Sequence, residues 1–196
     1  KSIVDLDKWS LSYGSLLIKN AIALMEAYEY FDDNKYKTLS ESLIQGLIDQ
    51  TYHDDHFSIN HKHSFVYTHC HCYATEGIIY MISKGYNEFA PLALKSAQWL
   101  AENQNEDGSM YNWYLRGNVS RDKQGDVTAQ AIRIWILTDK KRFAENINIA
   151  TLFLKQLQSK QGGLYYNINS DGILSQDINS WVTIFGLQAT IWQIYE

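Results

Sequence analysis

All the histidines and cysteines of the chain fall within one short segment, residues 53–72. The histidines are His53, His56, His61, His63, His69 and His71, and the cysteines are Cys70 and Cys72. Imidazole is the side chain that changes charge close to neutral pH, so it serves readily as a general acid or base. The segment therefore predicts a proton-transfer site that needs no cofactor, with His69 or His71 as the group that moves the proton.

Imidazole and thiolate together are also the ligands that zinc prefers. A zinc site would draw on His56, His69, Cys70, His71 and Cys72. Against this, the segment has no Cys-x2-Cys or His-x3-His spacing, and four consecutive residues of one helical turn point in different directions. A third interpretation makes these residues the polar rim of a cavity, with the cysteines packed beneath it. The cysteines stand too close in sequence for an unstrained disulfide, and free thiols favour a reducing, cytoplasmic compartment.

Long polar side chains recur in segments that are otherwise apolar. Glu76, Gln130 and Gln188 occupy equivalent positions, and Asn20 matches them more loosely. Because a buried polar group without a partner costs about 1–3 kcal/mol, these residues are expected to bond to one another or to act on a ligand. In the second case Glu76 is a carboxylate suited to proton transfer. Arg133 requires a carboxylate, which is either Glu76 or an acid on the substrate.

The elements that must position these residues form a repeat. Gln50, Gln104 and Gln158 recur every 54 residues, as do Phe57, Tyr111 and Tyr165. Each copy predicts one strongly apolar helix and one amphipathic helix. The apolar helices are expected over residues 16–30, 72–83, 126–137 and 178–195, and the amphipathic helices over 36–48, 89–103 and 143–157. Helices that are apolar on every side are buried, so the first series predicts an inner ring and the second an outer ring.

The connections between these helices differ in length. Those from outer to inner helices are long, at 49–71, 104–125 and 159–177, and they contain glycine turns and aromatic residues typical of small hairpins. They collect at the end where the inner helices begin, and binding residues concentrate on such loops. That end therefore predicts a polar mouth.

Composition narrows the functional class. The net charge is -5 and the pI is about 5.7, which argues against nucleic acid as a partner because phosphate binding needs a concentrated basic face. No apolar run reaches the length of a membrane span. The chain starts with Lys1 and shows no leader, so we expect a processed or truncated polypeptide rather than a signal peptide. Residues 1–196 are expected to form a single domain, either whole or the C-terminal part of a larger toroid.

The repeat motif carries a family resemblance. The segments 104–110 (QNEDGSM) and 158–164 (QSKQGGL) resemble the Gln-to-aromatic repeat of terpenoid cyclases and protein prenyltransferases. They are similar, equally, to the repeat of carbohydrate-active α/α toroids, a group that includes polysaccharide lyases, unsaturated-glucuronyl hydrolases and sugar 2-epimerases. The resemblance implies an all-α fold, a toroid or partial toroid of helical hairpins. Full toroids have more helices than the seven expected here, so the rest are truncated, supplied by a partner chain or oligomer, or never existed.

The same resemblance implies a function: a polysaccharide lyase, glycoside hydrolase or sugar epimerase acting on a glycan. In the lyase scheme, His69 or His71 and Tyr73 serve as base and acid, while Asn179 and Arg133 neutralise the substrate carboxylate. The residues expected to bind substrate are Trp113, Tyr114, Asp126, Gln130, Trp181 and Gln188. Two alternatives remain open. One is an isoprenoid enzyme, for which Asp54-Asp55 is the crowded acidic pair near the mouth. The other is a non-catalytic glycan- or peptide-binding helical module.

Overall fold

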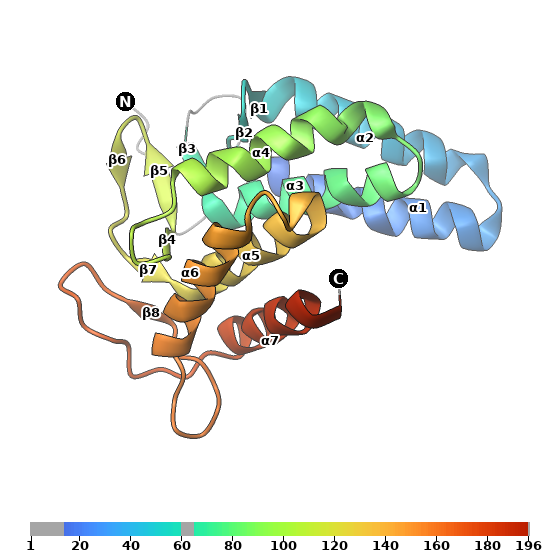
Figure 1. The fold of residues 1–196 in the computed structure, drawn as a ribbon. Helices are drawn as coiled ribbons and strands as arrows, with labels where there is room; N and C mark the ends of the chain where they lie inside the picture. Colours follow the sequence, from blue (N-terminus) through green and yellow to red (C-terminus); the bar gives the residue numbers. More distant parts are fainter. Residues whose placement is uncertain (1–13, 60–64, 196) are drawn as a thin grey trace.

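The computed structural model describes residues 14–59 and 65–195, and within them the expected helices are present (Figure 1). They are a 3-10 segment η2 (Ser15–Lys19), α1 (Asn20–Phe31), α2 (Asn34–Thr51), α3 (Thr68–Ser83), a 3-10 turn η3 (Asn87–Phe89), α4 (Ala90–Glu102), α5 (Gly125–Asp139), α6 (Ala144–Gln156) and α7 (Ser180–Tyr195). The bounds differ from the expected ones by a few residues. The difference that matters is at α3, which begins early enough to contain His69 and His71.

The helices form the two predicted layers. Helices α1 and α2, α3 and α4, and α5 and α6 pack as consecutive pairs, while α3 also packs on η2 and α5, and α5 on α7. Most residues of α3 and α5 are buried, whereas α2, α4 and α6 bury one stripe each. This contrast follows from the sequence, because a helix that is apolar on several sides needs neighbours on several sides. Helices α1, α3, α5 and α7 therefore form an inner series.

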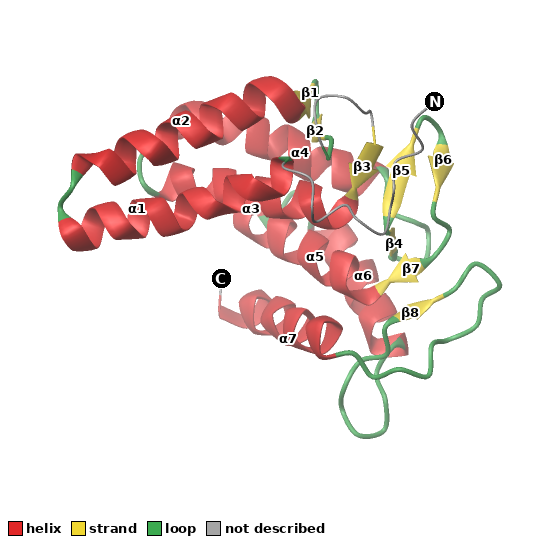
Figure 2. Cartoon of the chain, turned by 180° about the vertical axis from the view of Figure 1, so that it is seen from behind, coloured by secondary structure: helices red, strands yellow, loops and turns green. Residues whose placement is uncertain are grey.

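Short strands gather at one end of the molecule (Figure 2). They are β1 (Tyr52–His53), β2 (His56–Phe57), β3 (Phe65–Tyr67), β4 (Met110–Tyr111), β5 (Trp113–Leu115), β6 (Asn118–Val119), β7 (Lys123–Gln124) and β8 (Asn167–Ile168). They form antiparallel sheets in the orders β1-β2, β3-β5-β6 and β4-β7-β8. Every strand lies in one of the long outer-to-inner connections, so these connections build the mouth as expected.

The repeated glutamine and glycine fix these connections to the helices. Gln104 Nε2 donates hydrogen bonds to the carbonyl oxygens of Gly108 (3.1 Å) and Asn146 (3.0 Å), and Asn146 Nδ2 donates back to Gln104 Oε1 (2.7 Å). Gly108 has φ of 86°, and a Cβ there would lie 2.2 Å from the Ile149 carbonyl oxygen. Only glycine fits a left-handed turn this close to a helix backbone. In this copy the motif therefore holds the hairpin against α6.

The apolar core lies between the two layers. Its larger cluster joins α4, α5 and α6 around the fully buried Trp135, whose indole Nε1 donates to the Ala97 carbonyl oxygen at 3.0 Å. A second cluster joins α1, α2 and α3. Cys70 and Cys72 are both buried free thiols, as the sequence predicts. Among the described residues, no helix has the length and apolar character needed to cross a membrane.

Candidate functional site

The first turns of α3, α5 and α7 meet around a cavity of about 460 Å³. Its lining residues are Tyr67, His69, Tyr73, Asp126, Tyr166, Asn179 and Trp181. Each comes from the start of an inner helix, from the strand before it or from the neighbouring connection. The expectation that the inner helices present their starting ends to a shared cavity is therefore confirmed.

Helical periodicity extends this cavity inward along α3 and α5. His69, Tyr73 and Glu76 lie four and three residues apart on α3. Asp126, Gln130 and Arg133 follow the same spacing on α5. Residues at these intervals share one face of a helix. The two stripes approach each other at both ends, since His69 Nδ1 lies 3.9 Å from Asp126 Oδ2 and Arg133 Nη2 lies 2.6 Å from Glu76 Oε1.

Asp126 and His69 form the acid–base pair of the cavity. Their side chains are 15% and 16% exposed, so both touch the cavity while most of their surface is dehydrated. Burial raises the pKa of Asp126 to about 6, although backbone N–H groups at the start of α5 oppose this by favouring the carboxylate. Burial lowers the pKa of His69 to about 4; the charges of Lys19 and Arg133 contribute, and a hydrogen bond with Gln130 opposes them. Between about pH 4 and 6, Asp126 is thus a proton donor facing a neutral imidazole.

Tyr73 packs against this pair, with its ring centroid 4.2 Å from that of His69. Burial, together with the nearby Glu76 carboxylate, raises the pKa of the Tyr73 phenol to about 12. Burial also raises the pKa of Tyr67 to about 12. Both phenols therefore keep their protons at neutral pH and can donate hydrogen bonds, so Tyr73 is suited to the acid role rather than the base role.

A buried ion triad lies beneath the acid–base pair. Glu76 Oε2 lies 2.5 Å from Lys19 Nζ, and Glu76 Oε1 lies 2.6 Å from Arg133 Nη2. The side chains of Glu76 and Arg133 are 6% and 8% exposed, while that of Lys19 is 36% exposed. Of the two partners that the sequence allows for Arg133, Glu76 is the one that the structure places beside it. Glu76 thus contacts two cations beneath the cavity, whereas Asp126 is the carboxyl that lines it.

The triad has one more cation than it has carboxylates. The Arg133 guanidinium lies 4.7 Å from the Trp192 ring centroid and 5.3 Å from that of Phe185, and its Nε and Nη1 atoms are buried without a hydrogen-bond partner in the described residues. Lys19 Nζ lies 4.1 Å from the Tyr73 ring centroid. A buried guanidinium with unused donors favours an anion. The base of the cavity is thus electrostatically suited to a carboxylate or another anionic group.

His71 lies outside this arrangement, contrary to the prediction that it takes part in catalysis. Its ring is fully buried, the Phe57 backbone N–H donates to Nδ1 at 3.1 Å, and Nε2 lies 3.1 Å from the Ser96 carbonyl oxygen. Burial lowers its pKa to about 3. Two residues along a helix turn a side chain by more than half a circle, so His69 faces the cavity and His71 ties α3 to β2 and α4.

The predicted zinc ligands are dispersed as well. His56 pairs with Asp55 and packs on Trp99, while Cys70 and Cys72 enter separate apolar clusters. Both ring nitrogens of His71 already face backbone groups. Within residues 14–59 and 65–195, no three His, Cys, Asp or Glu side chains are grouped so that they could hold a metal ion. The alternation along α3 separates them, so the structure does not assemble the zinc set. His61 and His63 lie outside the described residues.

The predicted substrate-binding residues divide between two places. Asp126, Asn179 and Trp181 line the cavity, and the fully buried Gln130 lies between Asp126 and Arg133 along α5, close enough to His69 to influence its pKa. Asn179 also caps α7, because its Oδ1 accepts the Val182 N–H at 3.1 Å. Gln188 is half-buried on α7. Trp113 is half-buried, packs on Phe65 with ring centroids 5.8 Å apart, and is not among the residues that line either cavity.

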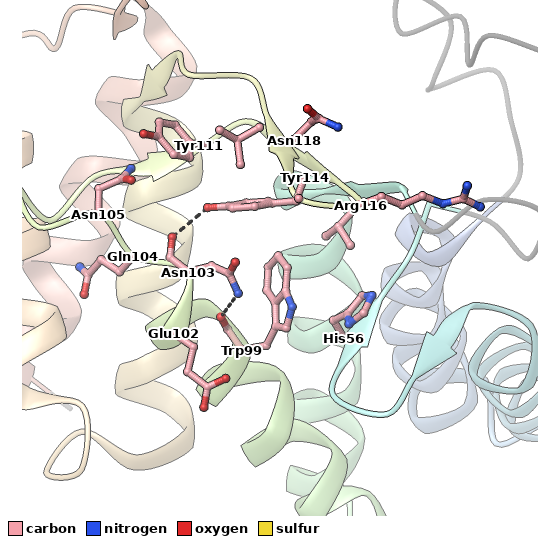
Figure 3. Close-up of a pocket in the computed structure, with 13 residues that line it drawn as sticks. His56, Trp99, Glu102, Asn103, Gln104, Asn105, Tyr111, Tyr114, Arg116 and Asn118 are labelled. Carbon is pink, nitrogen blue, oxygen red and sulfur yellow. Dashed lines mark hydrogen bonds between the residues drawn. The ribbon is translucent and has the colours of Figure 1, made fainter.

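Tyr114 lines a different and larger cavity of about 610 Å³ (Figure 3). This outer cavity lies between the end of α4 and the β3-β5-β6 sheet, whose register places Val66, Tyr114 and Val119 on one face. Tyr67, the next residue along β3, faces the inner cavity. The outer cavity's polar groups largely bond to one another: the Tyr114 hydroxyl donates to the Asn103 carbonyl oxygen (2.9 Å), and Asn103 Nδ2 to that of Trp99 (2.9 Å).

Sequence reasoning missed two residues of the site, Lys19 and Tyr67. The repeat alignment selects Asn20 as the first member of the polar ring, but Asn20 is exposed and its neighbour Lys19 reaches Glu76. Asn20 matches the repeat only loosely, and an alignment shifted by one residue would have selected Lys19. Tyr67 precedes α3 in an extended strand, and helical periodicity carries no information about it.

Comparisons with known proteins agree with this fold. No family model matches the chain and no curated protein matches its sequence, but eight chains of solved structures match its fold. One is glycosyl hydrolase family 88 from Bacteroides vulgatus, with a TM-score of 0.74 and 13% identity over 99% of this chain. Another is a mutant of unsaturated glucuronyl hydrolase from Streptococcus agalactiae complexed with dGlcA-GalNAc6S, with a TM-score of 0.66 and 16% identity over 97% of this chain.

The matched region spans 65% of the first of those chains and 60% of the second. Both are α/α toroids, so the predicted fold class is confirmed. The chain thus has the architecture of a toroid and is shorter than the toroids it matches.

Proposed function

We propose that the chain carries the site of a carbohydrate-active enzyme, a hydrolase that splits a glycan ending in an acidic sugar. The observation that carries this proposal is the protonatable carboxyl of Asp126, held in an aromatic cavity beside the neutral imidazole of His69. Glycoside cleavage needs a proton donor for the leaving oxygen and a base for the attacking water. The pair supplies both groups within one cavity.

In the proposed reaction, protonated Asp126 transfers its proton to the glycosidic oxygen as the bond from that oxygen to the sugar carbon breaks. Water adds to the sugar carbon, and His69 Nδ1 or Nε2 accepts the proton that the water loses. Return of that proton from the imidazolium to the Asp126 carboxylate restores the starting state. His69 Nδ1 and Asp126 Oδ2 are 3.9 Å apart, which is beyond direct hydrogen-bond distance, so the return passes through one bridging water.

The acidic substrate is favoured by the charge beneath the pair. Lys19 and Arg133 exceed Glu76 by one positive charge, and Arg133 has buried donors without a partner in the described residues. A sugar carboxylate that reaches this depth satisfies them. Tyr67, Tyr73 and Trp181 offer ring faces for the sugar. The ligand named for the second toroid above, dGlcA-GalNAc6S, supports a sugar of this acidic type.

Other reactions from the sequence interpretation use the same groups differently. A lyase or an epimerase removes a proton beside the carboxylate, for which neutral His69 is the base and Tyr73 the acid. The isoprenoid alternative has less support, because Asp54 and Asp55 lie in the turn between β1 and β2, away from the residues that line the inner cavity. A binding module without catalysis is tested by the experiment below.

The test is to incubate the purified chain with disaccharides that end in an unsaturated uronate, in a saturated uronate or in a neutral hexose. Products are identified by mass spectrometry, and the conjugated alkene is followed by ultraviolet absorbance. We expect cleavage of uronate-ended disaccharides and none of the neutral one. Cleavage of the neutral sugar alone would refute the acidic substrate. Calorimetric binding with no turnover of any substrate would refute the enzyme and favour the binding module.

A further inference from the structure

The outer cavity takes no part in the reaction proposed above, yet it has the size of a ligand site. Its volume of about 610 Å³ falls within the roughly 300–1,000 Å³ of small-molecule sites. One wall is the sheet face that carries Val66, Tyr114 and Val119, and the other is the end of α4. Arg116 and Gly117, with φ of 45° and 82°, form the tight two-residue turn that keeps β5 and β6 paired in that wall.

Two tyrosines supply aromatic surface to the outer cavity. Tyr111 and Tyr114 are both half-buried, and their ring centroids lie 6.2 Å apart. The Tyr114 ring is held in place, because its hydroxyl donates to the Asn103 carbonyl oxygen at 2.9 Å and the ring lies edge-on to Trp99, 5.1 Å between centroids. Rings that are fixed before binding lose little conformational entropy when a ligand packs on them.

The polar wall presents amide oxygens rather than amide hydrogens. Asn103 Nδ2 donates to the Trp99 carbonyl oxygen at 2.9 Å, and Asn105 Nδ2 donates to the carbonyl oxygen and the hydroxyl of Ser109 at 3.1 and 3.0 Å. These bonds fix the orientation of both amides, so that their side-chain oxygens are the atoms left for a ligand. A surface of acceptor oxygens selects a ligand that brings hydrogen-bond donors, such as hydroxyl groups.

The charged side chains of the lining do not favour an acidic ligand here. Figure 3 shows the ends of Glu102 and Arg116 on different sides of the Tyr114 ring and directed away from it. Glu102 Oε1 accepts a hydrogen bond from Gln98 Nε2 of the same helix at 3.1 Å. His56 Nδ1 lies 2.7 Å from the Asp55 carboxylate, so any positive charge on this imidazole is already matched. Acceptor oxygens without a free cation beside them repel a carboxylate.

We propose that the outer cavity is a second, non-catalytic sugar site that binds a neutral pyranose. The faces of Tyr111 and Tyr114 pack on the sugar ring, and the side-chain oxygens of Asn103 and Asn105 accept hydrogen bonds from its hydroxyl groups. The two cavities then differ in the charge of the sugar that each prefers, acidic inside and neutral outside. The outer site does not depend on which reaction the inner cavity catalyses.

Valine methyl groups report on both cavities in a single NMR spectrum. Val66 and Val119 line the outer cavity, whereas Val127 and Val182 lie in the first turns of α5 and α7, at the inner cavity. The purified chain, labelled at valine methyls, is titrated with the neutral methyl glycosides of glucose, galactose and N-acetylglucosamine, and with methyl glucuronide. We expect at least one neutral glycoside to shift the Val66 and Val119 methyls saturably at millimolar concentration, and the glucuronide to leave them unshifted.

A pair of substitutions at one ring separates packing from folding. Tyr111→Ala removes the ring face and is expected to weaken binding of the neutral glycoside about tenfold. Tyr111→Phe keeps the face and is expected to keep the affinity within about twofold. Trp181→Ala, in the inner cavity, is the matched aromatic control and should leave the Val66 and Val119 shifts unchanged.

Three results would overturn the proposal. The first is that none of the neutral glycosides shifts the Val66 and Val119 methyls of the native chain. The second is that the glucuronide shifts these methyls at least as strongly as the neutral sugars do. The third is that Tyr111→Ala, shown by circular dichroism to be folded, binds the neutral glycoside as tightly as the native chain. If Tyr111→Ala does not fold, the methyl shifts of the native chain still decide the question, because they need no variant.

Discussion

Two cavities lie on opposite sides of the β3-β5-β6 sheet, and the larger one is not the better candidate site. The outer cavity is about 610 Å³ and the inner about 460 Å³. In the outer cavity, the polar atoms of Tyr114, Asn103 and Gln104 are bonded to neighbouring carbonyl groups. In the inner cavity, burial raises the pKa of Asp126 to about 6 and lowers that of His69 to about 4, so their order is reversed. Dehydrated groups that can exchange protons distinguish a reactive site better than volume does.

Replacing one carboxyl in each cavity tests most directly which of the two cavities is the reactive site. We expect Asp126→Asn to reduce turnover of the uronate-ended disaccharide by about a thousandfold, because the amide has no proton to donate. Glu102→Gln, in the outer cavity, is expected to leave turnover within about twofold. Steady-state kinetics on both variants checks this. If Glu102→Gln were the damaging change, the two cavities would have been assigned the wrong way round.

The ion triad predicts the largest effect on folding. Glu76→Gln leaves the buried Arg133 guanidinium, and the partly exposed Lys19, without their carboxylate, so we expect a loss of about 3 kcal/mol in the free energy of unfolding. Urea denaturation measures this. Glu106→Gln, at an exposed position, serves as the matched control and is expected to change stability by less than about 0.5 kcal/mol. Equal stability of the two variants would mean that the triad is not formed.

His69 and His71 lie on the same helix, and substitutions of the two test the inner cavity further. His71→Ala leaves the Phe57 N–H and the Ser96 carbonyl without a partner and opens a cavity, so we expect a loss of about 3 kcal/mol in stability. Turnover per folded molecule should be kept. His69→Ala should reverse this pattern, with stability nearly kept and turnover reduced about a hundredfold. A thermal melt and a kinetic assay on each variant separate the two roles, and a shared pattern would contradict the assignment.

The last prediction concerns the difference in stability between Asp126→Asn and the native chain, which is expected to depend on pH. The pKa of Asp126 is raised from 3.8 to about 6 in the folded chain, so folding is favoured by its protonated form below 3.8. This advantage is lost as the pH rises through 6. Calorimetry should therefore find Asp126→Asn more stable than the native chain by about 6 °C at pH 8, with the two melting temperatures converging near pH 4. A constant difference at both pH values would argue against the raised pKa.

The pKa shift of His69 makes stability depend on pH in the opposite direction. Its pKa is lowered from 6.5 to about 4 by burial, so its contribution to stability is present above pH 6.5 and is lost as the pH falls through 4. The native chain is thus expected to lose stability in acid more steeply than His69→Ala does. This difference in acid denaturation complements the kinetic comparison of the two histidines.

The fold was largely predictable from the sequence, because a repeat states the same structural information several times. The spacing of Gln104 and Gln158, and the contrast between apolar and amphipathic helices, determined the layers, the order and the end that carries the mouth. Arg133 and Glu76 could be paired because a guanidinium in an apolar helix needs a carboxylate. These inferences depend on helical periodicity and on burial, which a sequence records well.

The chemistry was harder to assign. His69 and His71 are equivalent by composition, and only the exact start and rotation of α3 decide which one faces the cavity. Trp113 and Tyr114 are neighbours on β5 and face opposite sides of a sheet whose register the sequence does not state. The sequence predicts Asp126 as a substrate-binding residue and gives no sign of its raised pKa, because that shift arises from burial in the folded chain. Burial of a side chain by distant parts of the chain cannot be recognised in a local sequence pattern.

The central claim is that Asp126 keeps a proton at a pH where an ordinary aspartate has lost it. Carbon-13 NMR of the chain labelled at aspartate carboxyl carbons, with Asp126→Asn used to assign the resonance, measures this directly. The account predicts a titration midpoint near 6 for Asp126. A midpoint near 4, the value of a solvated aspartate, would show that the cavity does not hold a proton donor and would contradict the account.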